Sequence, residues 1–383
     1  MGAAPVGSGA GLRQSAVSRG GAAREGPGYS LPFEVGSLRR RPLPLGSLCA
    51  ARGRRAPAWR SRIRMAIDGK KFGVMLPHWE DHQGVGRKTR VANFLELARA
   101  AEESGLDSVW AVDHFLSFRT ADESIFEYEL GPELEGVKIG YWECWTLMSA
   151  LAATTRSIEL GTLVTNTGYR NPALLAQMVN TVEDLSDGRV ILGLGAGDYS
   201  AEHEAFGFPF ERRVGRFEES LQIIRPLLRG ERVTFEGEFC RTREAELRPR
   251  APRAEGPPIL IGLLRGGPRM QRLVAQYADH WNCWMAEDTR VDVYQKAYAS
   301  IVEACERHGR DPETLRKNAS IALRLPGGVP ELHGIKPICG SIAEIQDGLG
   351  PLLEEDIDHF SVALDPASPE GIQRFVELLA GLR

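Results

Sequence analysis

The sequence lacks the cysteine patterns that mark zinc modules and disulfide scaffolds. Six cysteines are spread over 383 residues, none forms a Cys-x-x-Cys pair, and no histidine stands at zinc-finger spacing from one. This pattern argues against a structural zinc site and predicts free thiols in a reducing compartment, which points to the cytoplasm. No other spacing typical of metal ligands is present, so we expect no metal site.

Long apolar runs and an evenly spread positive charge are also missing. The uncharged segment 144–155 is too short to cross a bilayer, which takes about 18 or more apolar residues. The net charge of −4 divides into +10 over residues 1–64, where twelve arginines stand against two glutamates, and −14 over the remainder. The acidic charge of the remainder argues against nucleic-acid binding, because that needs a basic face. We therefore exclude membrane-spanning proteins, DNA-binding proteins and disulfide miniproteins, and expect no nucleic-acid or membrane partner.

Residues 1–64 differ from the rest of the chain in composition. They hold eleven glycines and six prolines and show neither a helical nor a strand period. Such a segment buries too little apolar surface to offset the entropy of ordering it, so we predict a disordered basic leader. Its origin stays open between a transit peptide, a basic tail that binds a partner, and sequence upstream of a true start at Met65, which we favour.

From Met65 onward, apolar strands alternate with amphipathic helices. Helical periods run over 91–103, 173–185, 216–228 and 270–277. Eight buried strands are predicted, at 72–76, 108–112, 158–164, 190–194, 259–262, 280–284, 320–325 and 360–364. Alternation of this kind calls for a parallel sheet, and eight even units favour a closed (β/α)8 TIM barrel over an open doubly wound sheet. We expect one barrel domain over residues 65–383.

A barrel of this kind takes about 250 residues, so insertions must hold the surplus. One is the acidic segment 117–141, after the second strand. The other is 231–258, after the fourth helix, where residues 233–239 read Val-Thr-Phe-Glu-Gly-Glu-Phe and predict a β-hairpin.

Chemistry in such a barrel lies at the carboxyl ends of the strands, and chemically useful residues stand at several predicted strand ends. They are His78 and Trp79 after the first strand, Asp113, His114 and Phe115 after the second, Thr165 and Asn166 after the third, Gly195, Gly197 and Asp198 after the fourth, and Trp284 in the sixth.

Histidine titrates near neutral pH, so His114 beside Asp113 is a candidate proton donor or acceptor. A histidine that only caps the loop is the alternative. His78 and His203 are weaker candidates. We interpret the acidic cluster that follows the fourth strand as solvated surface; its members are Glu202, Glu204 and Glu211.

Two glycine-containing segments lie at strand ends. Gly266-Gly267 stands between the fifth strand and a helix, where backbone amides and the helix dipole can bind a phosphate with help from Arg269. A plain tight turn is the alternative. The segment 193–197 is only half of a dinucleotide-binding fingerprint, because Asp198 replaces the third glycine and a loop rather than a helix is expected next. We interpret its glycines as room for a flat ring against the backbone.

Several strings of residues, in a fixed order, carry a resemblance to a known family. They are GLDSVWAVDHF at 105–115, LGTLV at 160–164, YRNPALLAQ at 169–177, SDGRVILGLGAG at 186–197, EAFGFPF at 204–210 with RFEE at 216–219, and YADHWN at 277–282. Over residues 71–284 the chain resembles the bacterial luciferase-like family of flavin and deazaflavin oxidoreductases. It is most similar to the branch that uses coenzyme F420, a deazaflavin.

The resemblance implies a (β/α)8 barrel with insertions that transfers a hydride between F420 and a small organic substrate. It makes His114 the proton-transferring residue, places Asp113 at the polar edge of the ring, and places a non-proline cis peptide at Leu163–Val164. As the chain neighbour of His114, Asp113 is also a candidate to orient the imidazole. The resemblance implies cofactor-binding residues at Asp113, Leu163, Val164, Gly195, Gly197, Asp198, Gly266 and Gly267. From their places at a strand end and beside the glycine turn, we add Thr165, Asn166 and Arg269. From their strand-end positions we also expect His78, Trp79, Phe115 and Trp284 to line the substrate pocket, with packing in the barrel core as the alternative for the three aromatic residues.

Two rival functions stay open at this stage. An FMN-dependent monooxygenase would use reduced flavin and oxygen, whereas a non-catalytic member of the family would bind a cofactor without turnover. The partners left open are a homodimer and a reductase that supplies reduced flavin or F420. Neither the substrate nor the direction of hydride transfer can be read from the sequence, because substrate-selecting loops vary most.

Overall fold

The computed structural model describes residues 67, 69–77, 90–118, 138–264, 266–328 and 335–382. All of them belong to one unit of the chain, Ala58–Arg383. The predicted leader at 1–64 and the predicted pocket residues His78 and Trp79 lie outside the described residues.

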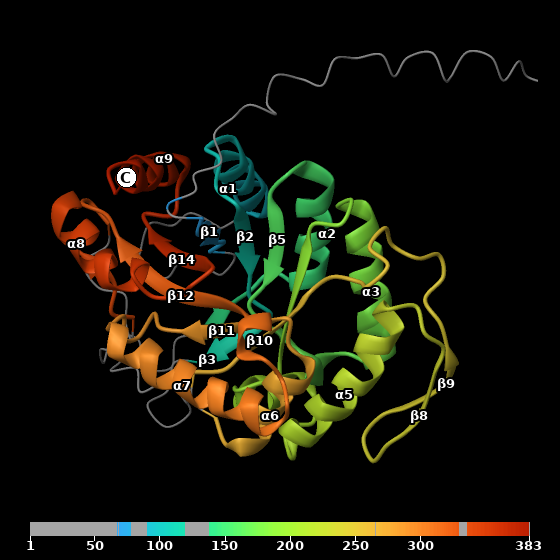
Figure 1. The fold of residues 1–383 in the computed structure, drawn as a ribbon. Coiled ribbons are helices and arrows are strands. Elements are labelled where there is room, and N and C mark those ends of the chain that lie inside the picture. The colour runs from blue at the N-terminus through green and yellow to red at the C-terminus, as the bar shows by residue number, and fades with distance from the viewer. Residues whose placement is uncertain are drawn as a thin grey trace, which may run out of the picture. The chain divides into compact units, whose positions relative to one another are not determined.

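Eight parallel strands close into a barrel (Figure 1). In order around the barrel they are β1 (Lys71–Met75), β2 (Ser108–Ala111), β5 (Glu159–Thr162), β7 (Val190–Gly195), β10 (Ile259–Gly262), β11 (His280–Trp284), β12 (Arg316–Arg324) and β14 (His359–Asp365). The ring closes because β10 pairs with β7 and β14 pairs with β1. Each predicted strand overlaps one of these eight, so the predicted (β/α)8 barrel is confirmed and the open sheet is wrong.

Helices surround the barrel and connect its strands (Figure 1). The helices predicted by periodicity are confirmed as α1 (Val91–Glu103), α3 (Pro172–Leu185), α5 (Arg213–Leu228) and α6 (Pro268–Tyr277). Asn171 caps α3 by accepting hydrogen bonds from two backbone amides, and Pro172 takes a position in its first turn. The remaining helices are α2 (Cys144–Thr154), α4 (Ser200–Phe206), α7 (Val291–Arg307), α8 (Ile342–Leu353) and α9 (Pro369–Ala380).

Several short strands and 3-10 turns add to the barrel. The hairpin predicted in 231–258 is confirmed as antiparallel β8 (Val233–Glu236) and β9 (Arg241–Ala245). The insertion after β2 begins with β3 (Leu116–Phe118), which pairs with β4 (Lys138–Gly140), and the residues between them lie outside the described part. The other short elements are β6 (Thr165–Asn166), β13 (Ile338–Cys339) and the 3-10 turns η3 (Thr167–Tyr169) and η4 (Pro312–Thr314). No helix within the described ranges is both long and apolar enough to span a bilayer.

The apolar core has two parts. The larger lies between strands and helices, and the smaller consists of Met75, Trp110, Leu163, Ile191 and Leu260. Trp110 is fully buried and donates its indole N–H to Ser108 at 2.7 Å. Its ring occupies the space beside Gly161, where a Cβ would lie 2.1 Å from the ring carbon Cε3. The glycine in β5 is therefore required by the tryptophan in β2.

Candidate active site

His114 and Glu202 meet at the carboxyl end of β2. His114 lies just beyond that strand, and its Nδ1 lies 2.8 Å from Oε2 of Glu202 on α4. The other oxygen of Glu202 accepts the backbone N–H groups of Phe115 and Leu116, the latter at 2.8 Å. The Tyr169 hydroxyl also donates to Oε2. One carboxylate thus holds the histidine ring, the loop after β2 and a residue of η3.

The interpretation of the acidic cluster as solvated surface is wrong for Glu202. Its side chain is 0% exposed, whereas Glu204 and Glu211 are exposed as expected. The reason is that a short helix, α4, begins at Ser200, where the sequence predicts only a loop after the fourth strand. In a helix, residues 202 and 204 point to opposite sides, so one can be buried while the other is exposed. In an extended segment both would point to the same side.

The charges around His114 favour its protonated form. Burial by itself lowers the pKa of His114, but the hydrogen bond with Glu202 and the negative charges of Asp198, Glu202 and Asp113 outweigh burial and raise the pKa from 6.5 to about 9. Burial likewise works against ionised Glu202, yet the bonds from His114, Tyr169 and the Phe115 amide lower the pKa of that carboxyl. The pair is therefore an ion pair at neutral pH.

Asp113 is held by Arg170 instead of by His114. The Arg170 guanidinium donates to both Asp113 oxygens, and the backbone N–H of Asn166 donates to Oδ2 at 3.0 Å. Burial raises the pKa of Asp113, while the hydrogen bonds and charge of Arg170 work in the opposite direction. The imidazole of His114 is thus oriented by Glu202 and not by its chain neighbour, which corrects the orienting role expected of Asp113.

The residues expected to lie behind the cofactor ring come together. The peptide bond between Leu163 and Val164 is cis, as the resemblance predicts. Leu163 belongs to the smaller core cluster, and Val164 and Trp284 pack against it. A Cβ added at Gly195 would lie 2.6 Å from Val164, so this glycine makes room for a protein side chain.

Gly197 is required by its backbone conformation and by its neighbours. Its φ is +82°, and a Cβ there would lie 2.6 Å from the Asn166 amide nitrogen and 2.8 Å from His203 Nε2. His203 is buried, and its Nε2 lies 2.9 Å from that same amide nitrogen. A side chain at Gly195 or Gly197 would therefore collide with protein atoms.

Thr165 and Asn166 behave differently although both are buried. The Asn166 side chain is satisfied by His203 and by the backbone N–H of Gly168. The Thr165 hydroxyl is buried and has no hydrogen-bond partner within the described part of the chain. Since buried polar atoms are nearly always paired, this hydroxyl marks a place where a ligand or a water molecule is expected.

The Gly266-Gly267 turn leads into the N-terminus of α6. Gly267 precedes the helix with no side-chain cap, and a Cβ built there would have no neighbour within 4 Å among the described residues. This open helix N-terminus can receive an anion. Arg269 is 55% exposed, but its charge is paired with Glu218, which also binds Arg272.

Phe115 lies in an aromatic cluster and not alone in a pocket. Its ring centroid lies 5.0 Å from that of Tyr169 and 4.9 Å from that of Phe206, and Tyr169 in turn lies 4.9 Å from Phe208. Trp284 donates its indole N–H to Glu287 at 3.0 Å and packs against the smaller core cluster, which contains Leu163. Packing within this aromatic cluster holds α4 against the end of β2. Because Glu202 lies on α4, the same packing keeps it buried.

A family model described as luciferase-like monooxygenase matches residues 70–325. The chain belongs to the luciferase-like monooxygenase family. It is 29% identical over 308 residues to a 5,10-methylenetetrahydromethanopterin reductase of Methanolobus tindarius, covering 72% of this chain and 84% of the relative. It is 30% identical over 249 residues to an F420-dependent glucose-6-phosphate dehydrogenase of Amycolatopsis mediterranei, covering 62% and 68%.

A solved structure agrees with the fold of this luciferase-like chain. It is an F420-dependent secondary alcohol dehydrogenase in complex with an F420–acetone adduct, with a TM-score of 0.64 and 21% sequence identity. The match covers 82% of this chain and 99% of the other. The family predicted from the sequence strings is thus confirmed, together with its barrel.

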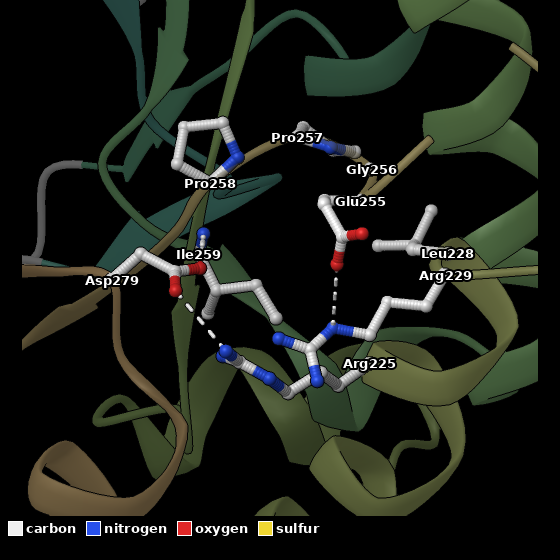
Figure 2. Close-up of a pocket in the computed structure, with 9 residues that line it drawn as sticks. All are labelled: Arg225, Leu228, Arg229, Glu255, Gly256, Pro257, Pro258, Ile259 and Asp279. Carbon is white, nitrogen blue, oxygen red and sulfur yellow. Dashed lines mark hydrogen bonds and ion pairs between the residues drawn. The ribbon is translucent and has the colours of Figure 1, made fainter. Parts of the chain in front are cut away.

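Two cavities of this luciferase-like barrel lie away from these residues. One, of about 300 Å³, is lined near the start of β10 by residues that include Arg225, Arg229, Glu255 and Asp279. Figure 2 shows Arg225 reaching Asp279 and Arg229 reaching Glu255, so both guanidinium groups are paired. The other, of about 60 Å³, lies beside the starts of β11, β12 and β14. Because barrel chemistry occurs at the opposite strand ends, neither cavity is the candidate active site.

Sequence reasoning missed three contributors to the site of this luciferase-like protein: Glu202, Tyr169 and Arg170. Tyr169 and Arg170 stand inside a string that carried the family resemblance, which was the one signal available for them. For Glu202 the only signal was its closeness to the fourth strand end. No cluster of three or more potential metal-ligating side chains occurs within the described ranges.

Proposed function

We propose that this luciferase-like protein transfers a hydride between coenzyme F420 and a small organic substrate, and that His114 exchanges the accompanying proton. The observation that carries the proposal is the placement of His114 at a strand end, with Nδ1 bound to a buried carboxylate and a side chain that stays 30% exposed. Among the described residues Nδ1 is the ring nitrogen that is hydrogen-bonded, which leaves Nε2 to exchange a proton with a substrate.

The residues present fit a flavin-like cofactor that carries a phosphate. The open N-terminus of α6 beside Gly267 suits the phosphate, and the unpaired Thr165 hydroxyl suits a polar group of the ligand. Val164 and Trp284 would support the ring from the barrel side. When bound, a deazaflavin supplies a carbon that accepts or donates hydride. The Asp113 side chain is fully buried and paired with Arg170, so it would support the loop beside the cofactor and not contact the cofactor directly.

The relatives favour F420 over FMN. Two of the proteins to which this chain is similar are described as F420-dependent. The family description itself names monooxygenases, so an FMN-dependent monooxygenase that consumes oxygen is the second candidate. A family member that binds a cofactor without turnover is the third.

Cofactor titration of the full chain separates these candidates. Purified protein is titrated with F420 and with FMN while tryptophan fluorescence is recorded, because Trp284 packs against the core cluster that contains Leu163. We expect F420 to bind more tightly and F420 absorbance to change with glucose 6-phosphate or with acetone as the probe substrate. Tighter FMN binding with oxygen-dependent product formation would establish the monooxygenase. Binding with no absorbance change across a wide panel of alcohols and ketones would favour the non-catalytic member.

We also propose that the protein works in the cytoplasm, on the evidence of its thiols. The cysteines of the described residues are free and are Cys144, Cys240, Cys283, Cys305 and Cys339. The homodimer and the reductase partner remain proposals, which size-exclusion chromatography with light scattering and a coupled reductase assay would test.

A further inference from the structure

The carboxylate of Glu202 has four donors and no solvent exposure. Oε1 accepts two backbone N–H groups, from Phe115 and Leu116, and Oε2 accepts the Tyr169 hydroxyl and bonds to His114 Nδ1. A carboxylate has about four lone-pair positions, so each of them has a partner here. The two backbone groups belong to the residues directly after His114, and the same carboxylate therefore fixes both the ring and the loop that carries it.

This arrangement determines which ring nitrogen carries the permanent proton. An ionised carboxylate only accepts hydrogen bonds, so the bond of 2.8 Å to Glu202 requires a proton on Nδ1. The proton that the ring gains and loses must then be on Nε2. A general acid or base needs its exchanging nitrogen on the substrate side, and a fixed partner on the other nitrogen supplies this orientation.

We propose that Glu202 is the positioning residue of this active site: it holds His114 with Nδ1 protonated and leaves Nε2 to exchange a proton with the substrate. The part that concerns the substrate rests on the function proposed above. The state of the ring is a property of the protein alone and can be measured without a cofactor.

The groups that face His114 come from several elements. They are Glu202 on α4, Asp198 in the segment before α4, Asp113 on the histidine's own loop, Tyr169 on η3, and Tyr141, whose ring centroid lies 5.3 Å from that of His114. The Tyr169 hydroxyl donates to the carboxylate and, with a pKa raised by burial and by the charge of Glu202, stays protonated. Among the acidic groups of the described residues, only Glu202 bonds to the imidazole.

NMR of the full chain with ¹⁵N-labelled histidine tests the proposal without cofactor. In the wild type we expect His114 to titrate near its raised pKa of about 9 and to keep the proton on Nδ1 when neutral. In Glu202→Gln the amide can donate to Nδ1, so the neutral ring should carry its proton on Nε2 and its pKa should fall to about 6.5 or below. Glu204→Gln is the matched control, because Glu204 is exposed on the same helix.

Activity supplies the second readout. If F420 is the cofactor, Glu202→Gln should lower kcat by about 10–100-fold with cofactor affinity changed only a few fold, and should move the alkaline limb of the pH profile to lower pH. Failure of F420 to bind the wild type would overturn the proposed function but leave the NMR result valid.

A wild-type ring that carries its neutral proton on Nε2 would overturn the positioning role, as would a His114 titration unchanged in Glu202→Gln. If Glu202→Gln does not fold, the wild-type spectrum alone decides, since the proton position on the neutral ring either agrees with the bond to Glu202 or contradicts it.

Discussion

The Nη atoms of Arg170 lie 2.6 and 2.9 Å from the two carboxylate oxygens of Asp113, which is a bidentate pair. The exposed fractions of the two side chains are 8% and 0%. Arg170 follows η3 and Asp113 follows β2, so the pair joins the ends of two strand-connecting segments at the active-site face. A charge left in such surroundings without its partner is costly, so the two residues are expected to depend on each other.

Arg170→Ala should therefore destabilise the fold by about 3–5 kcal/mol, because it leaves the Asp113 carboxylate buried and unpaired. Urea unfolding followed by circular dichroism would measure the change. Arg269→Ala is the control: Arg269 also forms a salt bridge but is 55% exposed, and exposed pairs contribute only about 0–1 kcal/mol. Equal losses in the two variants would contradict the burial argument.

Asp113→Asn and His114→Ala should separate cofactor binding from proton transfer. Asn keeps the shape of the Asp113 side chain but cannot form the ion pair with Arg170. Because we propose that this pair supports the cofactor site, F420 affinity should fall more in Asp113→Asn than in His114→Ala. His114→Ala should keep affinity within a few fold and lower turnover by about 10²–10⁴-fold, the usual contribution of a general acid or base. Single-turnover cofactor absorbance measures both. An unchanged rate in His114→Ala would show that this histidine only shapes the loop.

The ion pair of His114 and Glu202 makes stability depend on pH. Since the folded pKa of His114 is raised from 6.5 to about 9, its contribution to stability is fully present below about 6.5 and is lost as pH rises through about 9. The melting temperature should thus fall between pH 7 and pH 10, and this fall should be smaller in His114→Gln. Equal falls in both proteins would show that other groups dominate the alkaline limb.

The lowered pKa of Glu202 acts at the other end of the pH range. Its contribution is present above the ordinary carboxyl pKa and is lost as pH falls through the lowered folded value. Melting curves below pH 5 should therefore show a smaller acid loss in Glu202→Gln than in the wild type. Glu204→Gln, at an exposed position, should behave as the wild type does.

Local patterns were sufficient to predict the barrel. A helical period over 91–103 matches α1 residue for residue, and each apolar strand segment is confirmed, because both follow from which side chains one element must bury. The strand-end rule also found His114, since a polar residue directly after a buried strand lies at the mouth of the barrel whatever the rest of the chain does.

The missed partners depend on contacts distant in sequence. Arg170 bonds to Asp113 across 57 positions, and Glu202 bonds to His114 across 88. Nothing local distinguishes Glu202 from exposed Glu204, because the burial of Glu202 comes from α4 packing on the loop after β2. Likewise, only the fold shows that a Cβ at Gly195 would meet Val164 and that one at Gly197 would meet His203.

Gly161 and Gly350 should respond to alanine by different amounts. At Gly161 a Cβ would lie 2.1 Å from Trp110, whose fully buried ring is anchored by its hydrogen bond to Ser108, so the ring cannot move aside. Gly161→Ala should cost about 1–3 kcal/mol of unfolding free energy through overpacking.

Gly350 lies inside α8, where a Cβ meets no atom within 4 Å among the described residues other than its chain neighbours. Gly350→Ala should change the free energy of unfolding by less than about 0.5 kcal/mol, because the lower backbone entropy loss of alanine in a helix is opposed by the contact of its Cβ with the ring of Pro351, which follows it in α8. Chemical unfolding of both variants measures the two changes, and a neutral Gly161→Ala would show that the interior of the barrel can repack around Trp110.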